Sequence, residues 1–397
     1  MNEENYASIF LKKGKEKSVN RLHPWIFSGA LQNVADTIQE GDIVKLYDFD
    51  KQYIATGHYQ KSSLALRIFT FFEEEINDMF WQKKIQTAYD IRQKINAFPN
   101  AHTNCFRLVH GEGDDLPGLI IDYYNGVAVI QCHSVGMYLI KEKITLALQQ
   151  VLGDKLIAVY NKSEGTIPFK GGVEAANGFL FGDTTNIEVL ENNVKFAIDI
   201  VAGQKTGFFI DQRENRTLLA QYSKGKKVLN TFCYSGGFSI YASKANASLV
   251  HSVDSSAKAI ALTENNYALN FDPLPYHQSF TEDVMQYLNN MTEQYDVIVL
   301  DPPAYAKHTN ALDHALKGYS RLNKKAMEKI SAGGILFTFS CSQVVTKEDF
   351  KRAVFTAALQ SGRNVKILHQ LHQPADHPIS IFHPEGEYLK GLVLYVE

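Results

Sequence analysis

The hydrophobic pattern of the first 73 residues consists of short apolar runs separated by turn residues. Between residues 41 and 72 these runs lie at 43–47, 53–57 and 64–69. Short segments rich in Ile, Val, Tyr and Phe that follow one another closely are typical of strands in a small closed sheet. We therefore predict a small β-barrel that occupies residues 1–73.

After residue 75 the pattern becomes helical. Five apolar residues recur at the spacing of one helix face: Phe80, Ile85, Ala88, Ile91 and Ile95. Further on, strands are expected at 105–110, 119–124, 127–133, 156–160 and around 173–174, with a helix at 137–152 between the third and the fourth. This mixture predicts an α+β module over residues 74–199.

From residue 200 onward apolar runs alternate with helical segments, which indicates an α/β domain over residues 200–397. The strands are expected at 228–232, 249–254, 295–301, 334–342, 365–371 and 389–396. Asp211 and Glu214 are spaced as in a capping arrangement at the start of the first helix. The last two strands form a hairpin, which fits a Rossmann-like sheet of seven strands whose last strand is antiparallel.

Composition and charge narrow the possibilities. No run of about 18 apolar residues occurs among the 397, so no transmembrane helix is expected. The four cysteines are widely spaced and form no C-x-x-C, which argues against zinc and against disulfides and favours a reducing cytoplasm. Because the net charge is −3, a nucleic-acid surface would have to be a local patch.

Such a patch exists near the N-terminus. Its basic residues are Lys12, Lys13, Lys15, Lys17 and Arg21. They lead into an aromatic cluster with Trp25 and Phe27. Cations beside aromatic rings suit RNA, through phosphate contacts and base stacking. A solvated leader, with both aromatics in the core, is the alternative.

The first turn of the α/β domain, Ser235-Gly236-Gly237, is a candidate ligand site. A strand, a glycine turn and a helix together build nucleotide sites in open sheets, although Gly-Gly is also common in plain tight connections. Asp254 ends the next strand, where an acid suits hydrogen bonding to ribose hydroxyls. Ser255 or Ser256 then caps the following helix.

A loop at the start of the α/β domain, before its first helix, carries Lys205 and the pair Phe208-Phe209. It has two interpretations. One is an inter-domain linker with a hydrophobic staple. The other is a lid over a ligand, whose aromatic faces accommodate an adenine or a sulfonium.

Asp301 ends a predicted strand and is followed by Pro302-Pro303 and Tyr305. The prolines make a stiff, extended exit, so Asp301 is held at the carboxyl end of the sheet, where such sheets bind ligands. A carboxylate and a planar ring at this place suit a methyltransferase acting on an extruded base. A nicotinamide-dependent dehydrogenase is disfavoured, because G-x-G-x-x-G is absent.

Cys341 ends another strand at the same predicted edge. A lone cysteine in a strand is usually a small buried hydrophobe. At the carboxyl end, its thiolate could instead attack carbon 6 of a pyrimidine and make carbon 5 nucleophilic toward a methyl donor. Four histidines between residues 369 and 383 have irregular spacing and intervening prolines, so we expect a loop over the substrate there and no metal.

Taken in order, several stretches resemble the RlmI-type ribosomal RNA cytosine-5 methyltransferases. They are HPWIFSG at 23–29, LPGLIID at 116–122, GQKTGFFIDQR at 203–213, FCYSGGFS at 232–239, DPPAY at 301–305 and FSCSQ at 339–343. The resemblance covers nearly the whole chain. It implies an N-terminal PUA barrel, a module of strand-strand-helix-strand-strand type and a class I methyltransferase domain that uses S-adenosylmethionine.

The resemblance also implies roles for individual residues. Cys341 would be the nucleophile, and Asp301 would lie between cofactor and base. The remaining cofactor-binding residues would be Phe232, Tyr234, Ser235, Gly236, Asp254 at the ribose, Ser255, Asp283 at the adenine amine, Lys205 and Phe208. RNA, by implication ribosomal, would contact the basic patch and Tyr305.

Several alternatives stay open. The loop after Asp301 lacks the second cysteine that many cytosine-5 enzymes carry, so the base that removes the carbon-5 proton is unidentified. Methylation of guanine or of an exocyclic amine needs no nucleophile and uses the same architecture. A non-catalytic RNA-binding factor is a third option, and the sequence leaves a homodimer open.

Overall fold

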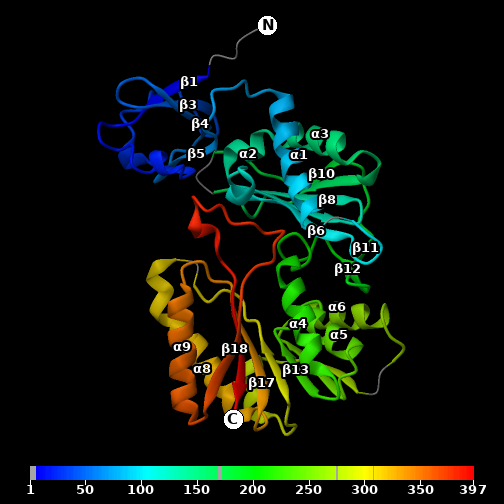
Figure 1. The fold of residues 1–397 in the computed structure, drawn as a ribbon. Helices are drawn as coiled ribbons and strands as arrows, with labels where there is room; N and C mark the ends of the chain where they lie inside the picture. Colours follow the sequence, from blue (N-terminus) through cyan, green and yellow to red (C-terminus); the bar gives the residue numbers. More distant parts are fainter. Residues whose placement is uncertain (1–5, 98, 169–171, 274–275, 307) are drawn as a thin grey trace. The chain divides into compact units, whose positions relative to one another are not determined.

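The computed structural model describes residues 6–97, 99–168, 172–273, 276–306 and 308–397. The chain forms two compact units (Figure 1). The N-terminal unit comprises Met1–Val189, Ile198–Ile210 and Ala375–Gly386, and the C-terminal unit comprises Leu190–Ala197, Asp211–Pro374 and Glu387–Glu397. Within the described ranges, no helix is long and apolar enough to cross a membrane.

The first sheet of the N-terminal unit has the strand order β1-β3-β4-β5-β2. Its strands are β1 (Ala7–Phe10), β2 (Trp25–Phe27), β3 (Ile43–Tyr47), β4 (Tyr53–Tyr59) and β5 (Leu64–Thr70). Val44 and Leu46 of β3 are fully buried while their neighbours are partly exposed, which is the alternation of a half-buried strand. The three predicted strands are confirmed. The short β1 and β2 lie outside them.

The two aromatic residues of β2 are not core residues. Phe27 is 55% exposed, Trp25 is half-buried, and the buried residue of the strand is Ile26 between them. The Nε1 of Trp25 donates to Glu112 Oε1 at 2.7 Å, and the guanidinium of Arg67 lies 5.5 Å from the centre of the Trp25 ring. The core interpretation of these two rings is therefore wrong.

The second sheet of the N-terminal unit has the order β10-β9-β8-β7-β6. Its elements are α1 (Asp78–Lys94), β6 (Cys105–His110), β7 (Leu119–Tyr124), β8 (Val127–Cys132), α2 (Val135–Leu139), α3 (Lys141–Leu152), β9 (Ala158–Asn161) and β10 (Gly178–Phe181). The helix expected at 137–152 is two helices, because the backbone of Ile140 leaves helical geometry at φ −104° and ψ 11°. The strand expected around 173–174 is wrong, since β10 begins at Gly178.

The C-terminal unit has a seven-stranded sheet in the order β15-β14-β13-β16-β17-β19-β18. Its strands are β13 (Lys227–Thr231), β14 (Leu249–Asp254), β15 (His277–Thr281), β16 (Val297–Leu300), β17 (Gly334–Ser340), β18 (Val365–Leu371) and β19 (Lys390–Val396). β19 is antiparallel to both of its neighbours, and β13 to β17 pair in parallel. The predicted α/β class and its antiparallel last strand are confirmed. A separate hairpin, β11 (Ile187–Glu191) with β12 (Val194–Ile198), was not among the predicted strands.

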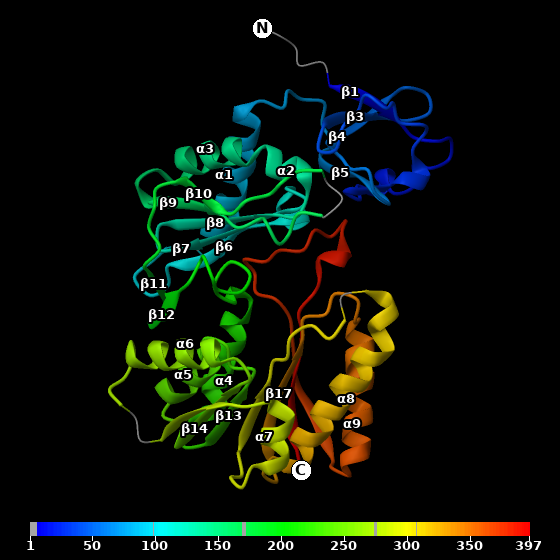
Figure 2. The same ribbon diagram turned by 180° about the vertical axis from the view of Figure 1, so that it is seen from behind.

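Helices cover both faces of this sheet. They are α4 (Arg213–Ser223), α5 (Gly237–Lys244), α6 (Ala257–Ala268), α7 (Val284–Asn290), α8 (Leu312–Lys329) and α9 (Lys347–Ser361). Figures 1 and 2 show α4, α5 and α6 on one face and α8 and α9 on the other. Successive strand residues belong to different cores: Val228 packs on the α4–α5 side and Leu229 on the α7–α9 side. Both faces are apolar, as a parallel sheet requires.

The start of α4 differs from the expected capping arrangement. The residue at its N-cap is Gln212, with no side-chain cap, and a short 3-10 turn (Ile210–Gln212) precedes it. Asp211 instead accepts a hydrogen bond from the hydroxyl of Tyr388 at 2.7 Å. The predicted capping role of Asp211 is therefore wrong, because a residue distant in sequence takes its carboxylate.

Candidate active site

The carboxyl ends of four parallel strands meet at one edge of the C-terminal unit. Thr231 at the end of β13 pairs with Val253 of β14 and with Leu300 of β16, and Leu300 pairs with Thr338 of β17. Phe232, Asp254, Asp301 and Cys341 come at or directly after these ends. Ligands bind at this edge in open α/β sheets. The register therefore brings together four of the predicted site residues.

The loop after β13, residues 232–237, has an unusual backbone. Phe232 and Tyr234 have positive φ angles of 55° and 47°, and Gly236 has φ 75°. Left-handed geometry at two bulky residues persists only when the surroundings impose it. At Gly236 an added Cβ would lie 2.8 Å from Cγ2 of Thr263, so both the φ angle and the space require glycine.

Contacts from neighbouring elements impose this loop conformation. The Tyr234 N–H donates to Asp254 Oδ2 at 3.1 Å, and Thr263 Oγ1 donates to the Tyr234 carbonyl at 3.0 Å. Asn266 Nδ2 donates to the Ser235 carbonyl at 2.9 Å. Thr263 and Asn266 were not among the predicted site residues, although their polar side chains in the helix after the second strand were a usable signal.

The three acids predicted to bind the cofactor have different local roles. Asp254 also accepts from the Ser256 N–H at 2.9 Å, while Asp283 caps α7 by accepting from the Gln286 N–H at 3.0 Å. Asp301 accepts from Gln212 Nε2 at 3.0 Å. An ionised carboxylate has about four acceptor sites, so hydrogen bonds of this kind are compatible with a ligand on the same carboxylate. Ser256 caps α6, and Ser255 is exposed beside it.

The loop after Asp301 is joined to the loop after β17. The Ala306 N–H donates to Ser342 Oγ at 3.3 Å, and the hydroxyl of Tyr319 bonds Ser342 Oγ and Ser340 Oγ, each at 3.0 Å. This network holds both serines that flank Cys341. The network explains why serines stand on both sides of Cys341, since Ser340 and Ser342 each form a hydrogen bond with Tyr319.

Tyr305 packs against the protein on one side. Its ring centre lies 4.7 Å from that of Tyr319, and burial raises the pKa of Tyr305 to about 12. The side chain is partly exposed. Stacking of a base on its other face stays a prediction.

Cys341 differs from the other cysteines in exposure. It is partly exposed, whereas Cys105, Cys132 and Cys233 are buried. Cys233 lies in the loop after β13, where its Sγ is 3.5 Å from Thr263 Oγ1 and burial raises its pKa to about 12. A buried thiol of that kind is a poor nucleophile, so Cys341 is the better candidate.

The remaining predicted residues lie in the N-terminal unit. Phe208 is only 3% exposed, whereas Lys205 is exposed and its Nζ lies 4.7 Å from the ring centre of Phe209. The five residues of the basic patch are all exposed: Lys12, Lys13, Lys15, Lys17 and Arg21. Their predicted contacts with cofactor and RNA stay predictions.

One cluster in the N-terminal unit has metal-ligand character. Ligand atoms of His23, His383 and Glu385 lie within 4.8 Å of one another. However, His23 Nδ1 accepts from the Trp25 N–H at 3.1 Å, so the proton of the neutral ring is on Nε2, which faces Glu385 Oε2 at 3.4 Å. A metal would need that nitrogen unprotonated, and the arrangement is better described as a hydrogen bond to the carboxylate.

Comparison with known proteins identifies the family. Residues 9–71 match a model described as a PUA-like domain, and residues 106–380 match a model described as S-adenosylmethionine-dependent methyltransferase. Proteins named ribosomal RNA large subunit methyltransferase I from Shewanella frigidimarina and Aeromonas hydrophila are each 39% identical over 396 residues, with 98% of this chain and 99% of the relative covered.

A solved methyltransferase structure in complex with S-adenosylhomocysteine has the same fold. It aligns with a TM-score of 0.85 and 23% identity, over 98% of this chain and all of the other. With the carboxyl-edge loops described above, these matches are decisive for the family. This chain belongs to the ribosomal RNA large subunit methyltransferase I family, S-adenosylmethionine-dependent methyltransferases with an N-terminal PUA-like domain.

Proposed function

We propose that this enzyme transfers a methyl group to carbon 5 of a cytosine in large-subunit ribosomal RNA, through a covalent adduct with Cys341. The observation that carries the proposal is the position of this thiol. It is partly exposed at the carboxyl end of β17, next to a loop that begins with Asp301. Methylation of a guanine or an amine would need no such thiol.

The proposed reaction begins with addition of the thiolate to the pyrimidine ring and ends with its elimination. The Cys341 thiolate bonds carbon 6, and the electron pair of the 5,6 double bond moves to carbon 5. Carbon 5 then bonds the methyl carbon, whose bond to the sulfonium breaks. Loss of the carbon-5 proton to a base returns the electron pair, reforms the double bond and expels the thiolate. S-adenosylmethionine supplies the electrophilic methyl group.

Residues at the carboxyl edge of the sheet are suited to bind S-adenosylmethionine. We propose that Asp254 accepts hydrogen bonds from the ribose and that Asp283 accepts one from the adenine amine. The loop at 232–237 would hold the methionine part, with its backbone fixed by Thr263 and Asn266. Asp301 would lie between cofactor and base, held by Gln212.

The substrate class is inferred from the relatives and from surface charge. The similar proteins named above act, by their names, on large-subunit ribosomal RNA. The exposed lysines of the PUA-like domain suit phosphate contacts. Four free cysteines suit a reducing cytoplasm, and we propose that location.

Replacement of Cys341 tests the covalent mechanism. Cys341→Ala is expected to lower methyl transfer to unmodified ribosomal RNA by at least about a thousandfold, because no other group can form the adduct. Cys105→Ala, a buried cysteine of β6, is the matched control and keeps its activity. Mass spectrometry of the digested RNA identifies the product. Full activity of Cys341→Ala, or a methylated guanine, contradicts the proposal.

A further inference from the structure

Lys390 is a buried cation at the same sheet edge as Cys341. It begins β19 directly opposite Ser340, the residue before Cys341, and is 4% exposed. Its Nζ donates to the carbonyl of Ser342, the residue after Cys341, at 2.6 Å and to the carbonyl of Tyr388 at 2.7 Å. The side chain thus starts beside Ser340, and its ammonium group ends at the carbonyl of Ser342, the residue that follows Cys341.

The charge of Lys390 is not neutralised by a close ion pair, since Glu387 acts on it only from a longer distance. Among the residues described by the structure, no carboxylate lies within ion-pairing distance of its Nζ. Within the described part of the chain, its hydrogen-bond partners are two backbone carbonyls. A buried ammonium without a counter-ion is costly, and an anion that forms close by offsets that cost. The Cys341 thiol is the nearby group that can become such an anion.

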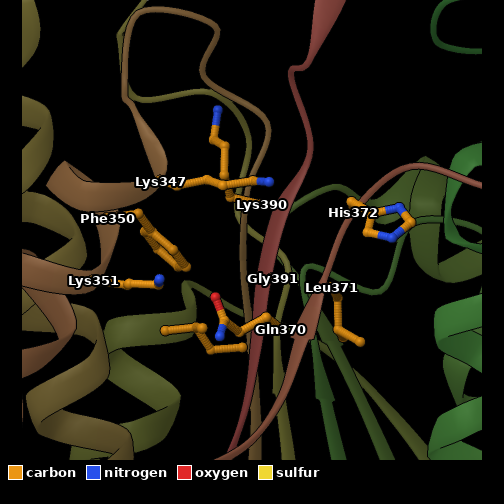
Figure 3. A pocket seen from close by; sticks show the side chains of 9 residues that line it. Lys347, Phe350, Lys351, Gln370, Leu371, His372, Lys390 and Gly391 are labelled. Carbon is orange, nitrogen blue, oxygen red and sulfur yellow. The ribbon is translucent and has the colours of Figure 1, made fainter. Parts of the chain in front are cut away.

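A small pocket of about 40 Å³ adjoins this side chain (Figure 3). Lys347, Phe350, Lys351 and His372 line it together with Lys390. The volume accommodates a few water molecules at most and no cofactor. Lys347 pairs with Glu387 at 2.5 Å and its side chain is 45% exposed, so solvent and Glu387 screen the charge of Lys347.

We propose that the ammonium of Lys390 holds Cys341 as the thiolate and thereby activates the nucleophile. This inference rests on the proposed function. The thiol proton leaves to water, Lys390 keeps its own three protons, and no other bond changes. Lys390 acts through Cys341 and is therefore a positioning residue. When the sulfur of Cys341 bonds carbon 6, the thiolate loses its negative charge and the ion pair with Lys390 ends.

The protonation of Lys390 is consistent with this role. Burial lowers the pKa of Lys390 to about 8, and the positive charge of Lys347 acts in the same direction. The interactions with Cys341 and, to a smaller extent, with Glu387 raise this pKa. At neutral pH the ammonium form therefore predominates. The positive charge is present where the thiolate is needed.

Alkylation of Cys341 measures its thiolate directly. The rate of reaction with iodoacetamide, followed by mass spectrometry of the Cys341 peptide, is recorded against pH in the full-length protein. In the wild type the midpoint should lie below about 8.5, the value of a free cysteine. In Lys390→Met the midpoint should rise by about one pH unit, which lowers the rate at neutral pH roughly tenfold. Lys390→Arg should stay near the wild type, and Lys347→Met is the matched control without effect.

The outcomes separate this inference from the proposed function. If Cys341→Ala keeps its methyl transfer activity, the covalent mechanism fails, whatever the alkylation profile. If Cys341→Ala is inactive but Lys390→Met alkylates with the wild-type midpoint, the role of Lys390 is overturned. Should Lys390→Met not fold, the wild type alone decides: a midpoint no lower in the native than in the urea-unfolded protein overturns the inference.

Discussion

Two buried cations of the C-terminal unit have opposite surroundings. Arg216 of α4 makes two hydrogen bonds to the carboxylate of Glu191, at 2.8 and 2.7 Å, and both side chains are almost fully buried. Lys390 is buried to a similar extent, but in the described ranges its hydrogen bonds go to two backbone carbonyls and to no carboxylate. The first cation is neutralised within the fold. The second keeps a charge available for another group.

The difference follows from the two side chains. A guanidinium presents a planar fork that matches both oxygens of a carboxylate, and it stays charged under all ordinary conditions. An ammonium is a point charge whose pKa responds to burial. Arg216 thus suits a structural ion pair. Its side chain also packs against Gly237 at the start of α5, where an added Cβ would lie 2.9 Å from the Cδ of Arg216. Lys390 suits a role in chemistry.

The largest effect is expected from Arg216→Met. The variant leaves the carboxylate of Glu191 buried without its main partner, so the free energy of unfolding should fall by about 3–5 kcal/mol. Urea denaturation followed by circular dichroism measures this. The alkylation midpoint of Cys341 in the folded variant should not move. A shift as large as that of Lys390→Met would break the distinction between the two cations.

A smaller effect on stability is expected from Lys390→Met. At neutral pH its free energy of unfolding should stay within about 2 kcal/mol of the wild type, because two hydrogen bonds are lost but a cation is no longer buried. Burial lowers the pKa of Lys390 to about 8 from its ordinary value of 10.5. Between these values the unfolded wild type binds more protons at Lys390 than the folded one, so wild-type stability rises with pH across this window.

The variant lacks this contribution. The wild type should therefore gain stability relative to Lys390→Met as the pH rises from about 8 to about 10, in urea denaturation at each pH. Unfolding free energies that differ by the same amount at all pH values would mean that Lys390 is not a buried cation.

The smallest effect is expected from Arg352→Met on α9. Arg352 pairs with Asp349 at 2.8 Å, but its side chain is 67% exposed. Exposed pairs contribute about 0–1 kcal/mol, so urea denaturation should show a change within that range. A loss comparable to that of Arg216→Met would show that burial is not what separates the pairs.

Strands and motif positions were largely predictable from the pattern. β14 has the predicted bounds and β13 differs by one residue at each end, because buried parallel strands appear as continuous apolar runs. The antiparallel edge strand β18 also has its predicted bounds, although it is largely exposed. The break at Ile140 was not predictable, since 137–152 is apolar at helical spacing throughout. The N-cap role of Ser256 followed from local chemistry. The capping role of Asp211 was wrong, because its carboxylate accepts a hydrogen bond from Tyr388, which is 177 residues away in sequence.

The sequence by itself determined the α/β alternation, the glycine turn and the order of acids and Cys341 along the chain. These depend on local backbone preferences and on the periods of helices and strands. Only the tertiary structure decided which residues surround Cys341. The antiparallel insertion of β19 beside β17 sets Lys390 opposite Ser340. No local pattern encodes that pairing, because register between distant strands is fixed by how their side chains pack on both faces of the sheet.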